Sequence, residues 1–264
     1  MSTAVTLALV GAIVLLVLVE FRDAEFARGW YQNRARLQRN LWYLAASLLV
    51  MPLLPVMNRQ IRSLAPGLAD WGDLGAPEIV TCFLVAELLG WLMHYVKHRN
   101  SFLWGFHFQH HREEQFNLWL TAHTHALEVA FSAALIALVL RLLGFSETAT
   151  TAYLIFYSFV KVYQHSALRY RLGPLDYLIV GPAYHRLHHQ VGSRCNYGVS
   201  LTVFDIIFRT VLWPEGRPAG REPRYGTGAG DLPFGFWEEM AFFLRGGTAP
   251  PDPSSRSLAK KSQP

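Results

Sequence analysis

The chain has 264 residues, of which 52% are hydrophobic and only 16% are charged, and its formal net charge is +5. So apolar a composition favours one membrane-embedded domain over one or two soluble domains. In a membrane protein the excess of positive charge belongs beside the inner leaflet, so nucleic acid is not expected as a partner. The two cysteines, Cys82 and Cys195, lie far apart in the sequence, which excludes a disulfide framework.

The first 77 residues are expected to form N-terminal transmembrane helices and a basic interfacial segment. Residues 3–19 are an unbroken apolar run without a basic region before it or a cleavage-site pattern after it, which favours a retained helix over a signal peptide. Residues 20–40 carry five arginines among aromatic residues and predict an amphipathic helix at the headgroups. A second apolar run, 41–57, should kink or end early at its prolines.

Three further apolar runs follow, at residues 78–96, 118–143 and 148–162. We therefore expect an all-α integral membrane protein with four to five transmembrane helices and a cytoplasmic, histidine-rich metal-site cap. Residues 78–213, which hold all eleven histidines, would form a second domain. The tail from 214 to 264 is rich in glycine, proline and charge and should be partly disordered.

The arginine distribution predicts the orientation. Residues 20–40 hold five arginines, against two in the loop 58–77, so the positive-inside rule places 20–40 in the cytoplasm. Alternation of the spans then puts 97–117 and everything after 165 on that same side. All the histidine clusters thereby fall on one membrane face.

Eight of the eleven histidines form three tight clusters, which are His94 and His98; His107, His110 and His111; and His185, His188 and His189. Positions i, i+3 and i+4 of a helix share a face, so each cluster aims its imidazoles at a common point. Neutral imidazole is the commonest metal ligand, and eight nitrogens suit two ions with about four each. His165, at the end of the 148–162 run, would add a ninth ligand from the same depth.

Other polar residues are candidates for further ligands or for hydrogen-bond partners of the ligands; they are His125, Glu87, Glu128, Asn196 and Asp205. An ionisable residue within a span is functional by default, and Glu87 stands two turns before His94, so it is expected to accept a hydrogen bond from an imidazole. His123 is the weakest histidine candidate, because it points away from His125 on a helix.

The order of these motifs resembles the fatty acid hydroxylase/sterol desaturase superfamily of integral-membrane di-iron enzymes. The motifs are H-x-x-x-H at 94–98, H-x-x-H-H at 107–111, Glu-Glu-x-x-Asn at 113–117, T-A-x-x-H-x-L-E at 121–128, Gln-His-Ser at 164–166, H-x-x-H-H at 185–189, Asn-Tyr-Gly at 196–198 and Asp-Ile-Ile-Phe at 205–208. The resemblance covers about residues 80–213 and implies that the domain 78–213 is a catalytic domain of this kind. It implies two iron ions that activate O2 and the hydroxylation or desaturation of a C–H bond in a lipid, such as a fatty acyl chain or a sterol-like lipid.

The chain has no dinucleotide-binding fingerprint and no haem-attachment motif, so electrons should come from an external reductase, ferredoxin or cytochrome. An all-histidine site discriminates poorly between metals, so purified protein could also hold zinc. A slot for the lipid, open to the bilayer, could be shaped by five aromatic residues, which are Trp91, Trp104, Phe106, Phe108 and Trp119. Their alternative role is in an interfacial aromatic belt.

Three other interpretations stay open. The chain could be a non-catalytic membrane metal-binding or transport protein, although a transporter needs ligands near the middle of the membrane. It could be a membrane haem protein, which needs single histidines on facing helices, or a family member that serves as a partner subunit. The sequence does not identify the lipid, the carbon that reacts, the electron donor or the oligomeric state.

Overall fold

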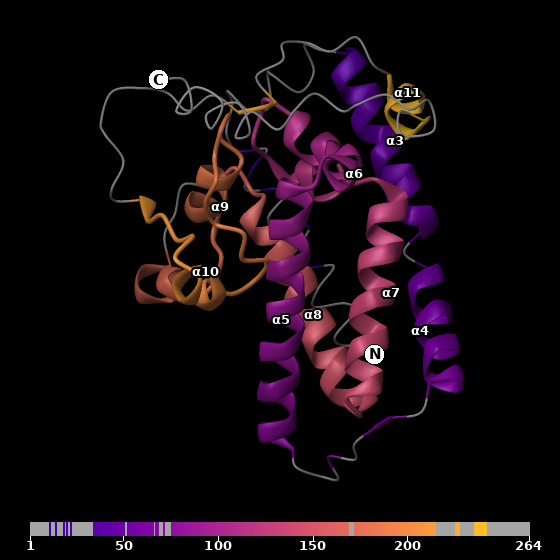
Figure 1. Ribbon diagram of the computed structural model, residues 1–264. Coiled ribbons are helices and arrows are strands. Elements are labelled where there is room, and N and C mark those ends of the chain that lie inside the picture. Colours follow the sequence, from indigo (N-terminus) through magenta and orange to yellow (C-terminus); the bar gives the residue numbers. More distant parts are fainter. Residues whose placement is uncertain are drawn as a thin grey trace, which may run out of the picture.

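Helices are the main regular structure in the part of the chain that the structure describes (Figure 1). This computed structural model describes residues 34–50, 52–65, 67–68, 71, 75–168, 172–214, 225–227 and 235–241, with Gly11, Val14, Leu18, Glu20 and Arg22. Two isolated β-bridges, Ile179–Leu201 and Gln190–Tyr225, are the non-helical pairings found among these residues. The predicted mostly helical fold is confirmed, whereas most of the apolar run 3–19 and of the tail from 214 lies outside the described residues.

Six longer helices build the frame: α3 (Arg34–Val50), α4 (Leu53–Leu64), α5 (Ala76–Arg99), α6 (Ser101–Arg112), α7 (Ala126–Leu142) and α8 (Glu147–Gln164). Shorter helices are η1 (Leu118–Thr121), η2 (Gly173–Tyr177), α9 (Pro182–His188), α10 (Val203–Ile207) and α11 (Phe236–Ala241). Helix α7 packs against α4 and α5, and α5 also packs against α8. Figure 1 shows these four running lengthwise, with α6, α9 and α11 gathered near one end.

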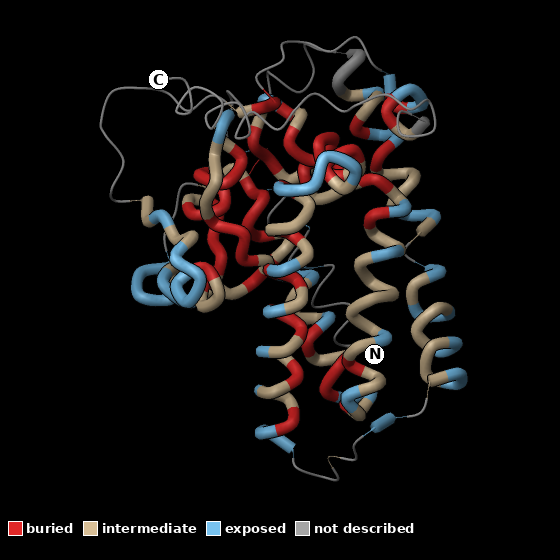
Figure 2. The backbone as a smooth tube through the Cα atoms, viewed as in Figure 1, coloured by how far each residue is buried: buried red, intermediate tan, exposed pale blue. Residues whose placement is uncertain are grey.

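Two stretches are long and apolar enough to cross a membrane, by length and composition alone. They are Leu37–Leu64, which runs through α3 and α4, and Ala76–Arg99, which is α5. Within an apolar window of 18 residues in each stretch, only 12% of the first and 33% of the second is buried within the protein, so much of their apolar surface faces outward (Figure 2). This outward apolar surface is what a lipid environment requires.

The predicted apolar run 118–143 is not one continuous helix. Its first residues form η1, and α7 begins only at Ala126. The Asn117 side chain accepts a hydrogen bond from Trp119 N, and His125 Nδ1 accepts one from Leu127 N, so each helix has its own capping residue. These caps satisfy amide groups that a helix start leaves unpaired, which is why the chain breaks between them.

A small apolar core joins α5, α7 and α8 at the end of the bundle away from α6. Cys82 and Ala86 of α5 pack there with Leu140 of α7 and with Ala149 and Tyr153 of α8. All five are almost completely buried. This core holds α5 and α8 in register, and both helices carry histidines at their opposite ends.

Gly198 lies where the loop after α9 crosses α5, and it has no room for a side chain. A Cβ built on Gly198 would lie 2.5 Å from the Leu201 carbonyl oxygen and 3.0 Å from Asp205 Oδ2. We expect Gly198→Ala to destabilise the protein by about 1–3 kcal/mol, because the clash is with backbone that cannot rotate away. Thermal unfolding in detergent would measure the loss.

Gly105 provides the matched control, since an added Cβ there meets nothing within 4 Å. Gly105 lies inside α6, so Gly105→Ala should raise stability by about 0.5–1 kcal/mol through the better helix propensity of alanine. Equal unfolding temperatures for the two variants would show that the backbone around Gly198 can move to accommodate a Cβ atom.

Candidate metal centre

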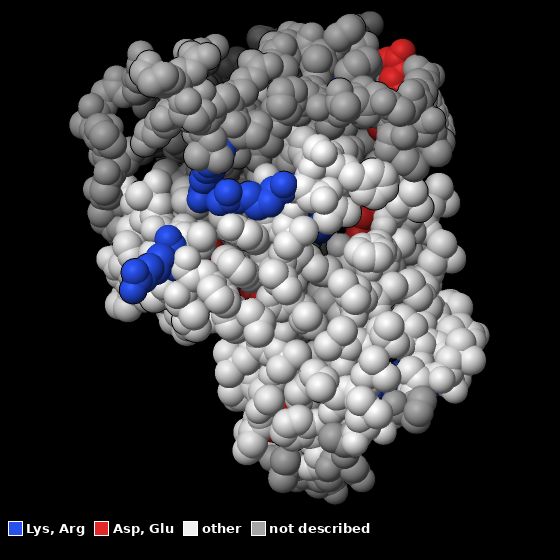
Figure 3. All heavy atoms as spheres, viewed as in Figure 1, with Lys and Arg blue, Asp and Glu red and all other residues white. Residues whose placement is uncertain are grey.

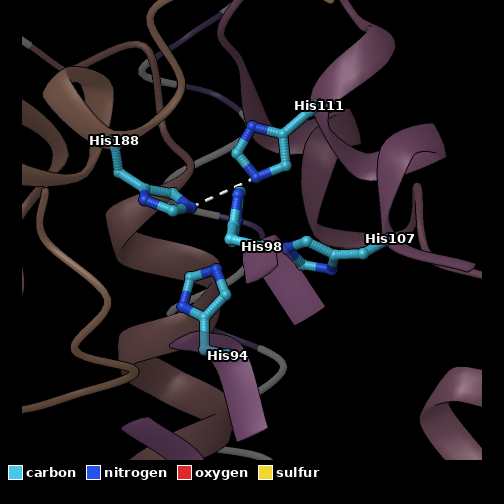
Figure 4. A group of neighbouring side chains, drawn as sticks. All are labelled: His94, His98, His107, His111 and His188. Atoms are coloured by element: carbon cyan, nitrogen blue, oxygen red, sulfur yellow. Dashed lines mark hydrogen bonds between the residues drawn. The ribbon is translucent and has the colours of Figure 1, made fainter. Parts of the chain in front are cut away.

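Nine buried histidines meet at one end of the bundle in two neighbouring groups. The five-histidine group consists of His94, His98, His107, His111 and His188 (Figure 4). The four-histidine group consists of His110, His165, His185 and His189. Within each group, one nitrogen from every histidine lies within 4.8 Å of all the others. The structure thus brings together all nine histidines that the sequence proposed as ligands.

Each H-x-x-H-H motif contributes to both groups. In α6, His107 and His111 are one turn apart and join the five-histidine group, while His110 joins the other group. In the motif of α9 the division is the opposite: His188 joins the five-histidine group, while His185 and His189 join the four-histidine group. Because both helices serve both groups, the two groups lie side by side, and the rings of His111 and His189 stack 4.3 Å apart.

The separations within the four-histidine group suit a metal ion. His165 Nε2 lies 3.1 Å from His110 Nε2 and 3.0 Å from His185 Nε2, and His185 Nε2 lies 3.1 Å from His189 Nε2. An ion with metal–nitrogen distances of about 2.1 Å holds adjacent ligands at right angles about 3.0 Å apart. The five-histidine group contains the same spacing, 3.1 Å between His188 Nε2 and His111 Nε2.

Hydrogen bonds fix which nitrogen faces the centre. In five histidines the Nδ1 group contacts an oxygen that can only accept: His94 to Tyr197 O (2.9 Å), His107 to Glu128 Oε1 (2.9 Å), His110 to His123 O (3.1 Å), His165 to Lys161 O (2.7 Å) and His188 to Cys195 O (2.9 Å). Nδ1 therefore carries the proton in each of these histidines, and the lone pair of Nε2 is available to bind a metal ion. The buried Nε2 atoms of His94 and His107 have no hydrogen-bond partner among the described residues, as expected of atoms that bind a metal.

Burial keeps the histidines of the two groups neutral. It lowers the pKa of His165 and His188 to about 3, and the pKa of His110, His111 and His185 falls well below the usual value for the same reason. Neutral imidazole is the form that donates a lone pair, so these side chains are ready to bind a cation near pH 7.

Glu128 and Lys97 support the five-histidine group from behind. Glu128 Oε1 accepts from His107 Nδ1 and, at 2.7 Å, from Lys97 Nζ, which also donates to Ser132 Oγ at 3.2 Å. The sequence proposed Glu128 as a candidate but not Lys97. Lys97 lies inside the H-x-x-x-H motif, and an ionisable residue so near a span was the signal that could have identified it.

We expect Glu128→Ala to weaken metal binding by about 10–100-fold, because His107 loses the acceptor that orients its ring. Competition with a chelator, followed by metal analysis, would measure the change. Glu114 is exposed on the same cap, so Glu114→Ala should leave the affinity unchanged. Equal affinities in the two variants would contradict this role for Glu128.

Asp205 and Asn196 organise the loop behind His94 and His188. Asp205 is fully buried and accepts hydrogen bonds from five groups: Trp91 Nε1, Tyr184 Oη, the Tyr197 and Gly198 amides, and Thr210 Oγ1. Asn196 has a positive φ of 60° and bonds the backbone of Tyr184 and Leu212. The carbonyls of Cys195 and Tyr197, which hold His188 and His94, are thereby fixed in place.

Glu87 does not have the imidazole partner that the sequence favoured. Its Oε2 atom accepts from the backbone amides of Ser200 at 3.0 Å and Leu201 at 2.7 Å. Glu87 lies two turns from His94 along α5, and the returning loop reaches its carboxylate first. It therefore anchors the loop that carries Tyr197, and its support of His94 is indirect.

The two other histidines lie outside both groups. His125 caps α7, and its Nε2 atom contacts Met240 O at 3.3 Å. His123 Nε2 contacts Asn40 Oδ1 at 2.5 Å, and its carbonyl accepts from His110. His123 thus supports a grouped histidine through its backbone, which sequence reasoning could not identify because any residue type has a carbonyl.

The five aromatic candidates have different surroundings. Trp104 lines a small cavity beside His98, His111 and His188. Trp91 stacks on Phe208 and on Tyr95. Phe106 makes an edge-to-face contact with His125, and Phe108 is buried against Trp104. Trp119 lies half-buried in η1. Trp104 is therefore the one of the five that the structure places at a cavity next to the histidines.

The fold and the site define a helical protein with candidate membrane helices and a two-part histidine centre fit to hold metal. Residues 79–210 match the model of the fatty acid hydroxylase family, and the chain belongs to this family. This confirms the resemblance inferred from the motifs.

Curated relatives point the same way. The chain is 29% identical to an ornithine lipid hydroxylase from Rhizobium tropici over 150 residues, which is 55% of this chain and 44% of the relative. It is 27% identical to an alkylglycerol monooxygenase from Caenorhabditis elegans over 50% of this chain and 26% of the relative, and 30% identical to one from Danio rerio over 48% and 29%. The matched region thus spans less than half of each of these relatives. No solved structure matches the chain.

Proposed function

We propose that this protein is a membrane-bound di-iron oxygenase that uses O2 to hydroxylate or desaturate a C–H bond of a lipid. The observation that carries the proposal is the division of nine buried histidines into two adjacent groups whose Nε2 atoms converge. Five and four imidazoles are enough for two ions, each with room for a ligand from outside the protein.

In this proposal the five-histidine group holds one iron ion and the four-histidine group holds the other. Iron bound in this way supplies the activation of O2 and the oxidising power to attack an unactivated C–H bond. The residues themselves orient the ligands, through Glu128 and the backbone carbonyls, and exclude water by burial. Exclusion of water protects a strongly oxidising site from side reactions.

The membrane arrangement follows from the same proposal. Leu37–Leu64 and α5 would form two spans of the bilayer. Helices α7 and α8, which have 17 and 18 residues, would bring the number of spans to four. Residues 3–19 would add a fifth span. The arginine-rich residues 20–40 favour a cytoplasmic position for the histidine end. Figure 3 is consistent with this: the largest Lys and Arg patches on the visible face lie at its middle height, while the lower part shows only small traces of charge.

The electrons would come from a separate reductase, ferredoxin or cytochrome. The net charge of +5 would attract an acidic carrier, and such steering weakens as salt screens it. Turnover by the reconstituted pair should therefore fall as ionic strength rises; turnover independent of salt would count against electrostatic docking.

The relatives suggest which substrates to examine first. They are named for ornithine lipid hydroxylation and alkylglycerol oxygenation, so polar membrane lipids with a long chain are the class to survey. Lipid extracts of cells that express the wild-type protein should contain a species with one added oxygen or two fewer hydrogens. Cells that express His188→Ala should lack it.

Mass spectrometry of the two extracts would test the proposal and identify the substrate. Identical lipids, with iron present in the wild-type protein and an electron donor supplied, would instead favour a non-catalytic membrane metal-binding or transport protein.

A further inference from the structure

An exposed apolar lobe projects from the side of the bundle beneath the histidine centre. We name it the η2–α10 lobe and define it as residues 172–180 and 201–212. Its two parts are joined by hydrogen bonds from Thr202 N to Leu178 O (3.0 Å) and from Thr202 Oγ1 to Tyr177 O (2.7 Å). Seven of its apolar side chains are between 47% and 58% exposed: Leu175, Tyr177, Leu178, Ile206, Ile207, Phe208 and Leu212. So many exposed apolar side chains on one lobe indicate a surface that something covers.

The position of the lobe along α5 indicates what covers it. Phe208 stacks on Trp91 with ring centroids 4.3 Å apart, and Asp205 accepts a hydrogen bond from the same indole. Trp91 lies eight residues before Arg99, the basic end of α5, so α10 is about 12 Å below that end at 1.5 Å per residue. The headgroup layer is about 5–8 Å thick on each side of a bilayer. With Arg99 in that layer, α10 lies in the outermost part of the acyl chains, a depth that interfacial apolar elements reach.

A groove with unsatisfied donors adjoins the lobe. It has a volume of about 470 Å³, and Gln190, Val191, Arg194, Cys195, Arg209 and Leu212 are among its lining residues. Gln190 Nε2 and Arg194 Nε are buried, yet neither has a hydrogen-bond partner among the described residues. A buried donor without a partner is costly, so these two atoms indicate an acceptor that is bound from outside.

The charge of the groove selects the kind of acceptor. Among the described residues that line it, two are arginines and none is acidic. Guanidinium groups match phosphate oxygens in geometry and in charge. A phosphate diester at the membrane surface would supply acceptors for the donors of the groove. Ile206 and Ile207 of α10, which precede Arg209 in the chain, offer exposed apolar surface for its acyl chains.

We propose that this groove binds the phosphate of an anionic phospholipid, such as phosphatidylglycerol, while the η2–α10 lobe is immersed among the acyl chains beside it. The inference rests on the membrane placement proposed above, but not on the oxygenase chemistry. The bound lipid would also stabilise the histidine centre, because Cys195 lines the groove and its carbonyl holds His188 Nδ1 at 2.9 Å.

Arg209 allows a test that does not depend on damaging the fold. Its φ is +58°, in the left-handed region, where glycine is favoured over every residue with a side chain. Arg209→Gly therefore relieves backbone strain at the end of α10 while it removes a cation from the groove. A loss of lipid binding in this variant could not be attributed to unfolding.

The experiment is a titration of the metal-loaded protein, in zwitterionic detergent, with phosphatidylglycerol, followed by native mass spectrometry and thermal unfolding. We expect one tightly retained phosphatidylglycerol and a higher unfolding temperature for the wild type. Arg209→Gly and Arg194→Gln should each weaken retention about five-fold, the effect of one arginine at an anionic surface. Arg99→Gln removes an exposed cation outside the groove and should retain the lipid as the wild type does.

Three results would overturn the proposal. They are equal retention by the wild type and both groove variants, equal retention of phosphatidylcholine, and an equal thermal shift with inorganic phosphate, which would make the ligand a free anion. The lipid analysis of His188→Ala tests the oxygenase separately, since it reports on products and not on retained phospholipid.

Discussion

Replacing His165 with alanine is expected to remove one metal ion per chain and to abolish turnover, with a loss greater than about 100-fold. His165 is the residue that α8 contributes to the four-histidine group, and its Nε2 lies 3.0–3.1 Å from those of His185 and His110. The Lys161 carbonyl orients its ring through Nδ1 at 2.7 Å. Without it, three histidines remain in that group, while the five-histidine group stays complete. Metal analysis of purified protein should fall from about two ions to about one.

His125 gives the matched control, because it belongs to neither group and caps α7. His125→Ala should retain both ions and lose about 1 kcal/mol of stability, the usual cost of removing a capping side chain. Full metal content and turnover in His165→Ala would show that His165 is not a ligand. Loss of metal from His125→Ala without a loss of stability would show that His125 is a further ligand of the four-histidine group.

Replacing Asp205 with alanine is expected to destabilise the protein by about 3–5 kcal/mol, although Asp205 contacts no grouped histidine directly. The substitution leaves five donors without their acceptor in a fully buried place. It also frees the loop whose carbonyls hold His94 and His188, so metal content should fall with stability. Thermal unfolding and metal analysis on the same preparation would measure both effects.

Asp205→Asn separates shape from charge. Asparagine retains one acceptor oxygen, at about the position of Oδ1 or Oδ2, so it should recover part of the stability and of the bound metal that alanine loses. Equal behaviour of the two variants would indicate that the carboxylate charge matters more than the geometry. Wild-type stability in Asp205→Ala would show that the loop is held by other contacts.

The sequence by itself determined which residues form the centre. Spacing of i, i+3 and i+4 on a helix is a local property, so H-x-x-x-H and H-x-x-H-H predict convergent imidazoles wherever the helices lie. Apolar runs likewise predicted α5 and α8 within a few residues, because helix length and hydropathy are read directly from the chain. His165 was identified in this way, from its place at the end of such a run.

Only the tertiary structure decided how the histidines divide and what holds them. His110 and His111 are neighbours in sequence but belong to different groups, because their directions from α6 differ: His111 meets the histidines of α5, and His110 meets His165 at the end of α8. Glu87 anchors a loop instead of an imidazole, since the chain returns to α5 after more than a hundred residues. Four of the five Nδ1 acceptors are backbone carbonyls, which every residue type carries. A pattern of side chains cannot encode them; the folded path of the chain places them.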